Sequence, residues 1–577
     1  MKCASVKQRV LFMCCVITMH TTFGEIYRDL ELDTLCRTID RTKTQLGFDA
    51  LHSLLSHPIT DQRILQSRQT AIAYLAHNTQ LHAQLGTLLT QFNQHEPCFE
   101  HIMQPASDIE KAALKEFYFS SNYFKKWNYS PAGVELGYVA HCGNLCSSMV
   151  QHALAFAIFT WGLQEQHTCA VHPPKKCSHD DHDHHHHHGC DHPIPTPNAF
   201  QLLIQSTEFR QAFAWWHGIA QIQELYAVGS IIRSDLQCIK KLQAELMDIS
   251  RGMHTINNIH ALLENHPELT ALITDYNDLE HVCSLNHISK KLHTLLALLK
   301  TPTFKGDPSI FSRMGVILVT YKLAKEIAHE LKPALAAIGE IDAYNSCAQL
   351  YNEHASSSCR YSFADYIVDA ETPYLSAHNF WHPLVTTQNI QLNSISLGAD
   401  NTPRHIILTG PNACGKSTNV KALTLCAYLA QTITLVPAQN YSQTLYKEIY
   451  SSMVVTDNIT QNMSLFVTEL NDAEELLTRI ENLTTHEYML ITLDELFKST
   501  HHEKGQLIAQ RLLEKLYESP QVMVLVSTHF EKLIELARTS NGMCANYTIN
   551  NFILEPGTGS SEKSFDIVRS HAKSRLL

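Results

Sequence analysis

The residues with the clearest chemical meaning lie in one short stretch of the C-terminal half, Gly-Pro-Asn-Ala-Cys-Gly-Lys-Ser-Thr at 410–418, which directly follows an apolar run at 406–408. Two glycines at this spacing let backbone N–H groups surround phosphates at the start of a helix. The lysine is expected to reach the β- and γ-phosphates and the serine to ligate Mg²⁺. The stretch predicts a site for ATP and Mg²⁺, built from Gly410, Pro411, Asn412, Gly415, Lys416, Ser417 and Thr418.

Two further apolar runs end in polar side chains. Residues 488–493 lead into Asp494 and Glu495, and residues 522–526 lead into Ser-Thr-His at 527–529. We expect Asp494 to hold Mg²⁺ together with Ser417, and Glu495 to polarise the attacking water. The imidazole of His529 comes where a group that senses the γ-phosphate would lie. Glu495 and His529 are therefore the predicted catalytic residues.

The elements that must position these residues differ between the two halves of the chain. After about residue 375, short β-rich runs alternate with helices, which is typical of a parallel sheet covered on both faces. Residues 25–130 and 199–355 instead show apolar positions at helical spacing. The expected fold class is α + α/β, with a long helical domain followed by a P-loop domain whose sheet is mainly parallel.

Length, charge and cysteine content set broad limits. The 577 residues suffice for two to four domains, and the net charge of −12 gives no global basic field. Contact with DNA would need a local patch or an enclosing shape. Seventeen scattered cysteines favour reduced thiols over a disulfide framework. Cys414 inside the glycine loop is either a tolerated substitution or a thiol whose oxidation blocks ATP binding.

The loop and several motifs around it resemble the MutS family of DNA mismatch repair proteins. The shared motifs, in chain order, are Trp-His-Pro-Leu at 381–384, Thr-Gly-Pro-Asn-Ala-Cys-Gly-Lys-Ser-Thr at 409–418, Val-Pro-Ala-Gln at 436–439, Ser-Leu-Phe-Val-Thr-Glu at 464–469 and the acidic pair at 494–495. The resemblance implies an ABC-type ATPase domain that binds ATP and Mg²⁺, with Gln439 in its Q-loop region. It also implies a homodimer through the ATPase domains, in which Ser464 reaches the neighbouring subunit's nucleotide. The implied partner is duplex, mismatched or branched DNA.

The helical part is similar to the core, or lever, domain of the same family. The stretch from Thr42 to Asp61 resembles the start of that domain, and Arg68 to Ile72 resembles its next helix. The expected domains are an apolar segment at 1–24, a helical core at 25–370 with a His-rich insertion at 169–197, and the ATPase domain at 375–577.

Three departures from the family pattern bear on function. The core begins near residue 25 and no Phe-x-Glu wedge can be placed, so mispair recognition by intercalation is not expected. The family's Asp-Glu-(Ile/Leu)-Gly-Arg-Gly-Thr reads Asp-Glu-Leu-Phe-Lys-Ser-Thr at 494–500, which predicts a stiffer loop. The chain ends soon after Phe565, so we expect the family's C-terminal helix-turn-helix, which locks the dimer, to be largely missing.

The insertion at 169–197 is rich in imidazoles and thiols, which suit Zn²⁺ or Ni²⁺. Its spacing fits no defined zinc finger and offers too many alternatives for one closed site. Weak binding of several ions is expected. The candidate ligands are His182, His184, His186, Cys190 and His192.

The leading hypothesis is an ATP-driven dimeric clamp on mismatched or otherwise structured DNA, with the helical arms gripping the duplex, in the cytoplasm where ATP is available. The alternative is a membrane-associated MutS-like ATPase outside mismatch repair, metal-responsive through its insertion. Basic residues before the apolar run 10–19 resemble a secretory signal, although an anchor or an ordinary N-terminus is also open. The predicted helix at 149–163 is apolar but short, which favours its interpretation as a helix of the protein core over a membrane span.

Overall fold

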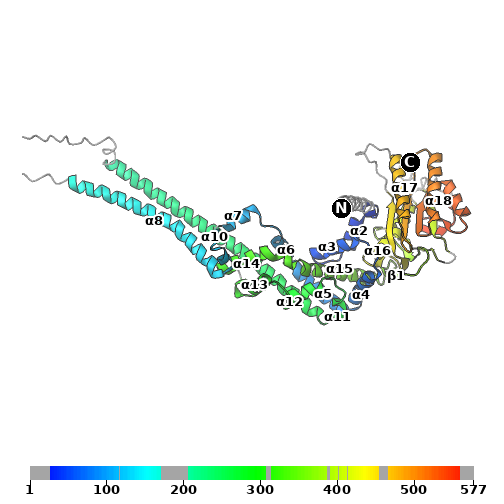
Figure 1. The fold of residues 1–577 in the computed structure, drawn as a ribbon, viewed down its shortest axis with the longest axis horizontal. Coiled ribbons are helices and arrows are strands. Elements are labelled where there is room, and N and C mark those ends of the chain that lie inside the picture. Colours follow the sequence, from blue (N-terminus) through cyan, green and yellow to red (C-terminus); the bar gives the residue numbers. More distant parts are fainter. Residues whose placement is uncertain are drawn as a thin grey trace, which may run out of the picture. The chain divides into compact units, whose positions relative to one another are not determined.

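The computed structural model describes residues 26–115, 117–170, 206–306, 313–385, 390–399, 402–411, 414–453, 465–498 and 500–558. The chain forms two compact units (Figure 1). The first comprises Met1–Glu96, His254–Asn286 and Lys332–Leu577, and the second comprises Pro97–Met253 and His287–Leu331.

In the helical part of the first unit, one long helix, α15 (Lys332–His354), packs against α3 (Gln45–Ser56), α4 (Gln62–His77), α5 (Thr79–Asn93) and α12 (Tyr276–Ser284). The same part contains α2 (Leu32–Ile39) and α11 (Pro267–Thr270). Asp61 caps α4 by accepting from the N–H of Arg63 at 2.8 Å, because an aspartate before the first turn satisfies otherwise unpaired amides. Leucines at helical spacing, such as Leu51 and Leu75, are buried as expected, whereas Ile64 is 50% exposed.

A close helix contact in this unit is made where Gly47 of α3 meets Asp342 of α15. A Cβ atom at Gly47 would lie 2.2 Å from Asp342 Oδ2. The buried carboxylate accepts hydrogen bonds from the backbone N–H groups of Lys43 and Thr44, and from Thr44 Oγ1 at 2.7 Å. Glycine is therefore required for α3 to approach α15 this closely.

The C-terminal part of the same unit contains a six-stranded sheet in the order β11-β10-β4-β9-β8-β7. The pairs β7/β8, β8/β9, β9/β4 and β4/β10 are parallel, and β11 pairs with β10 in the antiparallel sense. The strands are β4 (His405–Thr409), β7 (Tyr446–Ser452), β8 (Tyr488–Asp494), β9 (Val522–Ser527), β10 (Cys544–Asn550) and β11 (Ile553–Pro556). The three apolar runs that the sequence marked are all strands of this sheet.

A second sheet is mixed and has the order β3-β2-β6-β1-β5. Its strands are β1 (Ser362–Ile367), β2 (Leu375–Phe380), β3 (Asn393–Leu397), β5 (Leu435–Val436) and β6 (Asn440–Thr444). The fold is thus helix-rich with mixed sheets, which agrees with the expected α + α/β class at that level.

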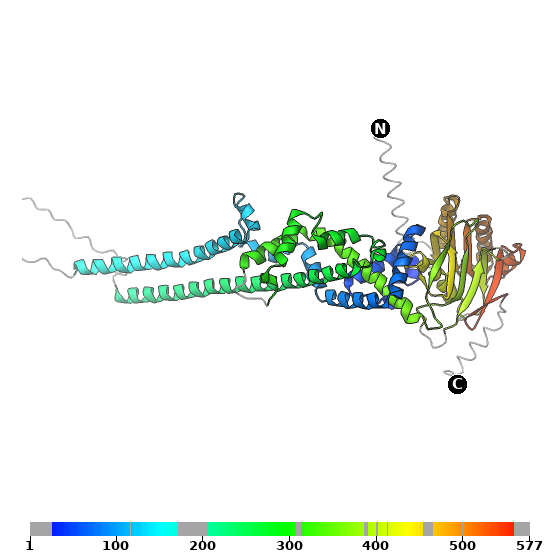
Figure 2. The same ribbon diagram turned by 90° about the horizontal axis from the view of Figure 1, so that it is seen from below.

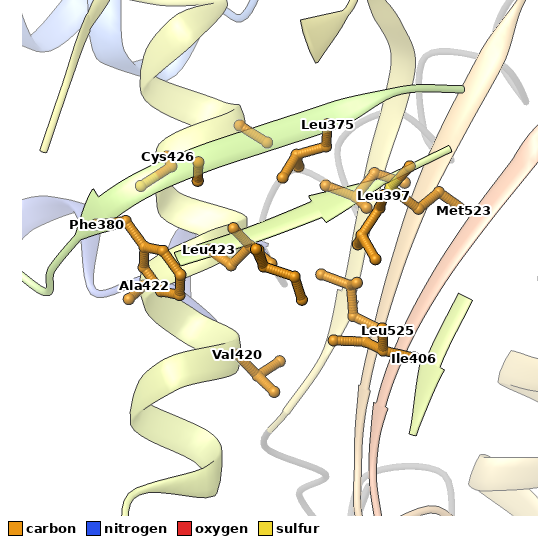
Figure 3. Packing of buried hydrophobic residues seen from close by; sticks show 14 of the residues in the cluster. Leu375, Phe380, Leu397, Ile406, Val420, Ala422, Leu423, Cys426, Met523 and Leu525 are labelled. Atoms are coloured by element: carbon orange, nitrogen blue, oxygen red, sulfur yellow. The ribbon is translucent and has the colours of Figure 1, made fainter. Parts of the chain in front are cut away.

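Helices cover both faces of the six-stranded sheet. Helix α16 (Lys416–Ala430) places Leu423 and Cys426 between the two sheets, where they meet Leu375 of β2 and Leu525 of β9 (Figure 3). Alternate strand residues such as Val524 face the opposite cluster, which receives side chains from the remaining helices, α17 (Leu465–Glu481), α18 (His502–Glu518) and α19 (Glu531–Thr539). A strand buried on both faces reads as a continuous apolar run, as these do.

The second unit is helical, and its longest elements are α8 (Pro131–Ala170) and the part of α10 (Thr207–Leu263) up to Met253. They run side by side in opposite directions (Figures 1 and 2), with Tyr138 Oη 3.3 Å from Asp235 Oδ2 and His152 Nδ1 3.1 Å from Glu224 Oε2. The other elements are α6 (Glu96–Met103), α7 (Asp108–Lys115), η1 (Lys125–Tyr129), α13 (Lys290–Leu299), η2 (Pro302–Phe304), α14 (Met314–Ile327) and η3 (Ala328–Leu331).

The expectation of a core helix at 149–163 is wrong for the side chains that the structure describes there. The segment belongs to α8, and Val150 and Leu154 are 62% and 60% exposed. Apolar composition alone did not reveal that this helix packs along α10 and leaves these two side chains uncovered. Among the described residues, no helix combines the length and the apolar character needed to cross a bilayer.

Candidate nucleotide site

The glycine loop connects β4 to α16. Gly410 and Gly415 have φ angles of 146° and 100°, which L side chains rarely adopt, so both glycines are required by the backbone. Lys416 begins α16 and is buried. Its Nζ donates to the carbonyl oxygens of Gly410 at 2.9 Å and Pro411 at 3.0 Å, and burial lowers its pKa. Two carbonyl groups of the loop thus hold the ammonium group.

The two residues predicted to hold Mg²⁺ are in direct contact. Ser417 Oγ donates to Asp494 Oδ2 at 2.7 Å, and Ser527 Oγ donates to the other carboxylate oxygen. The parallel pairing of β8 and β9 sets Asp494 opposite Ser527. A hydroxyl and a carboxylate oxygen are ligands that suit Mg²⁺, which commonly takes one or two protein carboxylates plus phosphate oxygens and water. The donor set therefore fits this ion.

The two predicted catalytic residues are also neighbours. Glu495 follows β8 with a φ of 53°, and its N–H donates to the carbonyl of Ser527 at 3.0 Å. Glu495 Oε1 lies 3.4 Å from His529 Nε2, and its other oxygen lies 3.7 Å from Lys498 Nζ. Burial and the nearby Lys416 ammonium lower the pKa of His529. A strained backbone at such a residue is typical of functional sites.

The loop after Glu495 is held by an apolar anchor that sequence reasoning did not identify. Phe497 has a φ of 51° and only 1% of its surface is exposed. A Cβ atom at Gly505 of α18 would lie 2.6 Å from the Phe497 carbonyl oxygen. The loop thus adopts a left-handed conformation without the family's glycines, and packing of the Phe497 ring holds it.

The turn between β10 and β11 is a second feature that sequence reasoning missed. The N–H of Phe552 donates to the Cys414 carbonyl at 3.1 Å, and a Cβ atom at Gly415 would lie 2.3 Å from the Phe552 ring. Asn393 Nδ2 donates to the Phe552 carbonyl at 2.8 Å, and Asn393 Oδ1 accepts from the N–H of Leu554 at 2.8 Å. Asn551 and Phe552 both have positive φ angles, 50° and 66°, and a phenylalanine at such a position is not the glycine that usually marks a hairpin turn, so only the fold shows that this turn meets the loop.

Some of the remaining predicted residues lie in the described part of the chain and others lie outside it. Gln439 precedes β6, and its Oε1 accepts from Asn379 Nδ2 at 2.7 Å, so this contact joins it to the second sheet. Thr418 lies in the first turn of α16. Burial raises the pKa of Cys414, which disfavours the thiolate and the oxidation hypothesis. The other predicted residues lie outside the described residues: Asn412, Ser464, His182, His184, His186, Cys190 and His192.

No other metal centre emerges from the part of the chain that the structure describes. Within those ranges, no group of three or more histidine, cysteine, aspartate or glutamate side chains is placed to hold an ion. The predicted Zn²⁺ or Ni²⁺ ligands fall in the insertion, so the structure neither supports nor tests them.

Comparison with known proteins gives matches in both halves. MutS domain III matches residues 21–128, and MutS domain V matches residues 406–555. The DNA mismatch repair protein MSH6 of Arabidopsis thaliana is 30% identical over 34% of this chain and 15% of its own length. The DNA mismatch repair protein MutS of Fervidobacterium nodosum is 29% identical over 39% of the chain and 26% of its own length. That of Thermotoga petrophila is 34% identical over 27% of the chain and 19% of its own length.

Fold and site together define a protein in which a helical core is joined to an α/β domain with a glycine loop between a strand and a helix. The matches to domains III and V identify the chain as a member of the MutS family. The matched part covers about a quarter or less of the length of the three relatives named above.

Proposed function

We propose that this chain is an ATP-dependent DNA-binding protein of the MutS type, which hydrolyses ATP at the loop between β4 and α16. The observation that carries the proposal is the contact of Ser417 Oγ with Asp494 Oδ2 at 2.7 Å, beside the Glu495–His529 pair. This arrangement supplies oxygen ligands for Mg²⁺ and a candidate base within one small region.

In the proposed reaction, the backbone N–H groups of the loop bind phosphate oxygens at the N-terminus of α16. Lys416 leaves the carbonyls of Gly410 and Pro411 and pairs with the β- and γ-phosphates, which offer it a stronger, charged acceptor. Ser417 and Asp494 would hold Mg²⁺, which when bound would supply positive charge beside the phosphate oxygens. Glu495 orients the attacking water and accepts its proton.

We propose that His529 couples the binding of the γ-phosphate to the position of Glu495. Burial and the Lys416 ammonium lower the pKa of His529 in the nucleotide-free site, which favours the neutral imidazole, and a neutral imidazole can donate one hydrogen bond without adding a charge. Its Nε2 lies 3.4 Å from Glu495 Oε1. Movement of the imidazole toward a bound γ-phosphate would therefore release Glu495 to face the water.

The wider activity is proposed from the family. Two chains pair through their ATPase domains, with Ser464 of each chain reaching the other chain's nucleotide, and the dimer acts as a clamp on mismatched or branched duplex DNA in the cytoplasm. The relatives named above carry DNA mismatch repair in their names, which supports a role related to repair.

The test compares Lys416→Ala with the wild type in ATPase assays with and without linear, mismatched and branched duplexes. Retention on DNA is measured in parallel. Lys447→Ala is the matched control, because this lysine lies in β7 of the six-stranded sheet and forms an exposed ion pair with Glu487. We expect DNA to stimulate turnover in the wild type and in the control, and Lys416→Ala to abolish it. Turnover that no DNA structure changes, without retention on DNA, would refute the proposal.

A further inference from the structure

Helix α10 carries a regular row of exposed apolar side chains in the hairpin that it forms with α8. Trp215, Ile219, Ile222, Tyr226 and Leu236 are 74%, 50%, 68%, 81% and 37% exposed. Their positions, continued through Gly229 and Arg233, follow alternating steps of four and three residues. This heptad spacing is typical of a helix that packs along another helix. We call these positions the α10 stripe.

The opposite side of α10 is already occupied by α8. Asp235 and Glu224 contact Tyr138 and His152 of α8, and Val228, in step with them, is only 8% exposed. A helix in a simple two-helix hairpin needs a single apolar seam. The α10 stripe is therefore a second seam, which α8 does not cover.

Helix α8 has a second seam as well. Leu136, Val139, Val150 and Leu154 are 56%, 65%, 62% and 60% exposed, and they recur at helical spacing through Gly143 and Cys146. We call these positions the α8 stripe. Two neighbouring helices that each carry an uncovered apolar row are expected to bury them against a further pair of helices, because four-helix bundles bury such rows at their centre.

The charge of the hairpin indicates which partner fits. Residues 131–170 contain no lysine or arginine, and residues 207–239 contain only Arg210 and Arg233. Binding of duplex DNA depends on lysine and arginine to neutralise phosphates, and helices that lie on a membrane surface are rich in the same residues. The hairpin therefore lacks the chemistry for either partner, and the expectation that these arms grip DNA has no support from their charge.

The exposed surface is large enough for specific association. An aromatic side chain buries roughly 150–250 Å² when covered, and Trp215, Trp216 and Tyr226 are each well over half exposed. Together with the aliphatic residues of the stripe, they present on the order of several hundred Å² of apolar surface, which in a soluble protein marks an interaction site.

We propose that the α8 and α10 stripes pair with the same stripes of a second copy of this chain and form a four-helix bundle. The same surface on both subunits is self-complementary about a twofold axis, and neither stripe offers a charge pattern that would select another protein. Among the described residues, no atom lies within 4 Å of the Cβ position at Gly143 or Gly229. These glycines let partner helices approach closely. The interface is separate from the pairing of ATPase domains proposed above and needs no nucleotide.

The experiment is sedimentation velocity of the full chain over a range of protein concentrations without nucleotide. The variants are Ile222→Lys and Tyr226→Lys, and the matched control is Gln223→Lys, which adds the same charge at a neighbouring exposed position off the stripe. All three sites are exposed, so the helix is expected to fold, and circular dichroism checks this. We expect each stripe variant to weaken dimerisation about ten-fold or more, with the control within about two-fold of wild type.

Two further measurements distinguish this interface from a nucleotide-dependent dimer and from a membrane-binding surface. Dimerisation should persist in Lys416→Ala, because the hairpin interface does not use ATP. Flotation with vesicles of phosphatidylcholine and phosphatidylserine should leave the wild type unbound. The proposal is overturned if the wild type stays monomeric at every concentration, if all lysine variants dimerise like the wild type, or if vesicles bind the wild type and release the stripe variants.

Discussion

The carboxylate of Asp29, near the start of the helical core, accepts a hydrogen bond from Ser451 at the end of β7. Asp29 Oδ2 accepts from Ser451 Oγ at 2.8 Å and from the N–H of Met453 at 2.8 Å. These residues are 422 and 424 positions apart in the chain from Asp29. Met453 precedes the Ser-Leu-Phe-Val-Thr-Glu motif at 464–469 in the chain, so this carboxylate joins the helical core to the strand that comes before that motif.

We expect Asp29→Ala to destabilise the protein by about 1–3 kcal/mol, because it leaves a buried hydroxyl and a buried amide without an acceptor. Asp29→Asn retains an acceptor oxygen but removes the charge. Because burial raises the pKa of the Asp29 carboxyl, the charged form is disfavoured in the folded protein, and the amide variant should match or exceed wild-type stability at pH 7. Urea denaturation of both variants measures this. Equal loss of stability in both variants would show that the charge, and not the acceptor, matters.

Gly47→Ala should destabilise the helical core by about 1–3 kcal/mol, because the added methyl group overlaps the Asp342 carboxylate. Gly86→Ala is the matched control in α5, where the nearest atom to a Cβ would be 3.8 Å away. That change should stabilise the protein by about 0.5–1 kcal/mol, since alanine is the better helix former. Thermal unfolding of the two variants should therefore move in opposite directions.

The stability of the core should depend on pH through Asp342. Burial raises the pKa of this carboxyl from 3.8 to about 6. A carboxyl with a raised pKa binds its proton more tightly in the folded state, so its contribution to stability is fully present below about pH 4 and is lost as the pH rises to about 6. The loss is on the order of 2–3 kcal/mol.

Asp342→Asn should remove this pH dependence, since the amide does not titrate. Chemical denaturation of wild type and variant at pH 4.5 and pH 7 gives the difference directly, because the other groups titrate alike in both proteins. An unchanged pH dependence in the variant would contradict the assignment to Asp342.

Glu495→Gln should lower ATP turnover by about 10²–10⁴-fold, because the amide cannot accept the proton of the attacking water. ATP binding should remain, since Lys416, Ser417 and Asp494 are intact. The measurement is single-turnover hydrolysis together with equilibrium binding of ATP. Glu503→Gln, an exposed glutamate in the first turn of α18, is the control and should hydrolyse ATP at the wild-type rate. Loss of ATP binding in Glu495→Gln would instead indicate a structural role for this glutamate.

Local chemistry determined much of the nucleotide site. The strands that end at Thr409, Asp494 and Ser527 and the helix that begins at Lys416 could be predicted, because buried parallel strands require apolar runs and the glycine loop requires special backbone angles. The contact of Ser417 with Asp494 follows from these rules, since the carboxyl ends of parallel strands lie at the same edge of the sheet.

Only the tertiary structure decided which surfaces are covered and which distant groups meet. The Asp29–Ser451 hydrogen bond and the packing of the Phe552 ring against Gly415 join residues far apart in the chain. No local sequence pattern encodes such a pairing. The apolar helix at 149–163 suggested a core, yet Val150 and Leu154 are exposed. Hydrophobic periodicity shows that a helix has an apolar face, but the partner that buries it is chosen by packing across the whole fold.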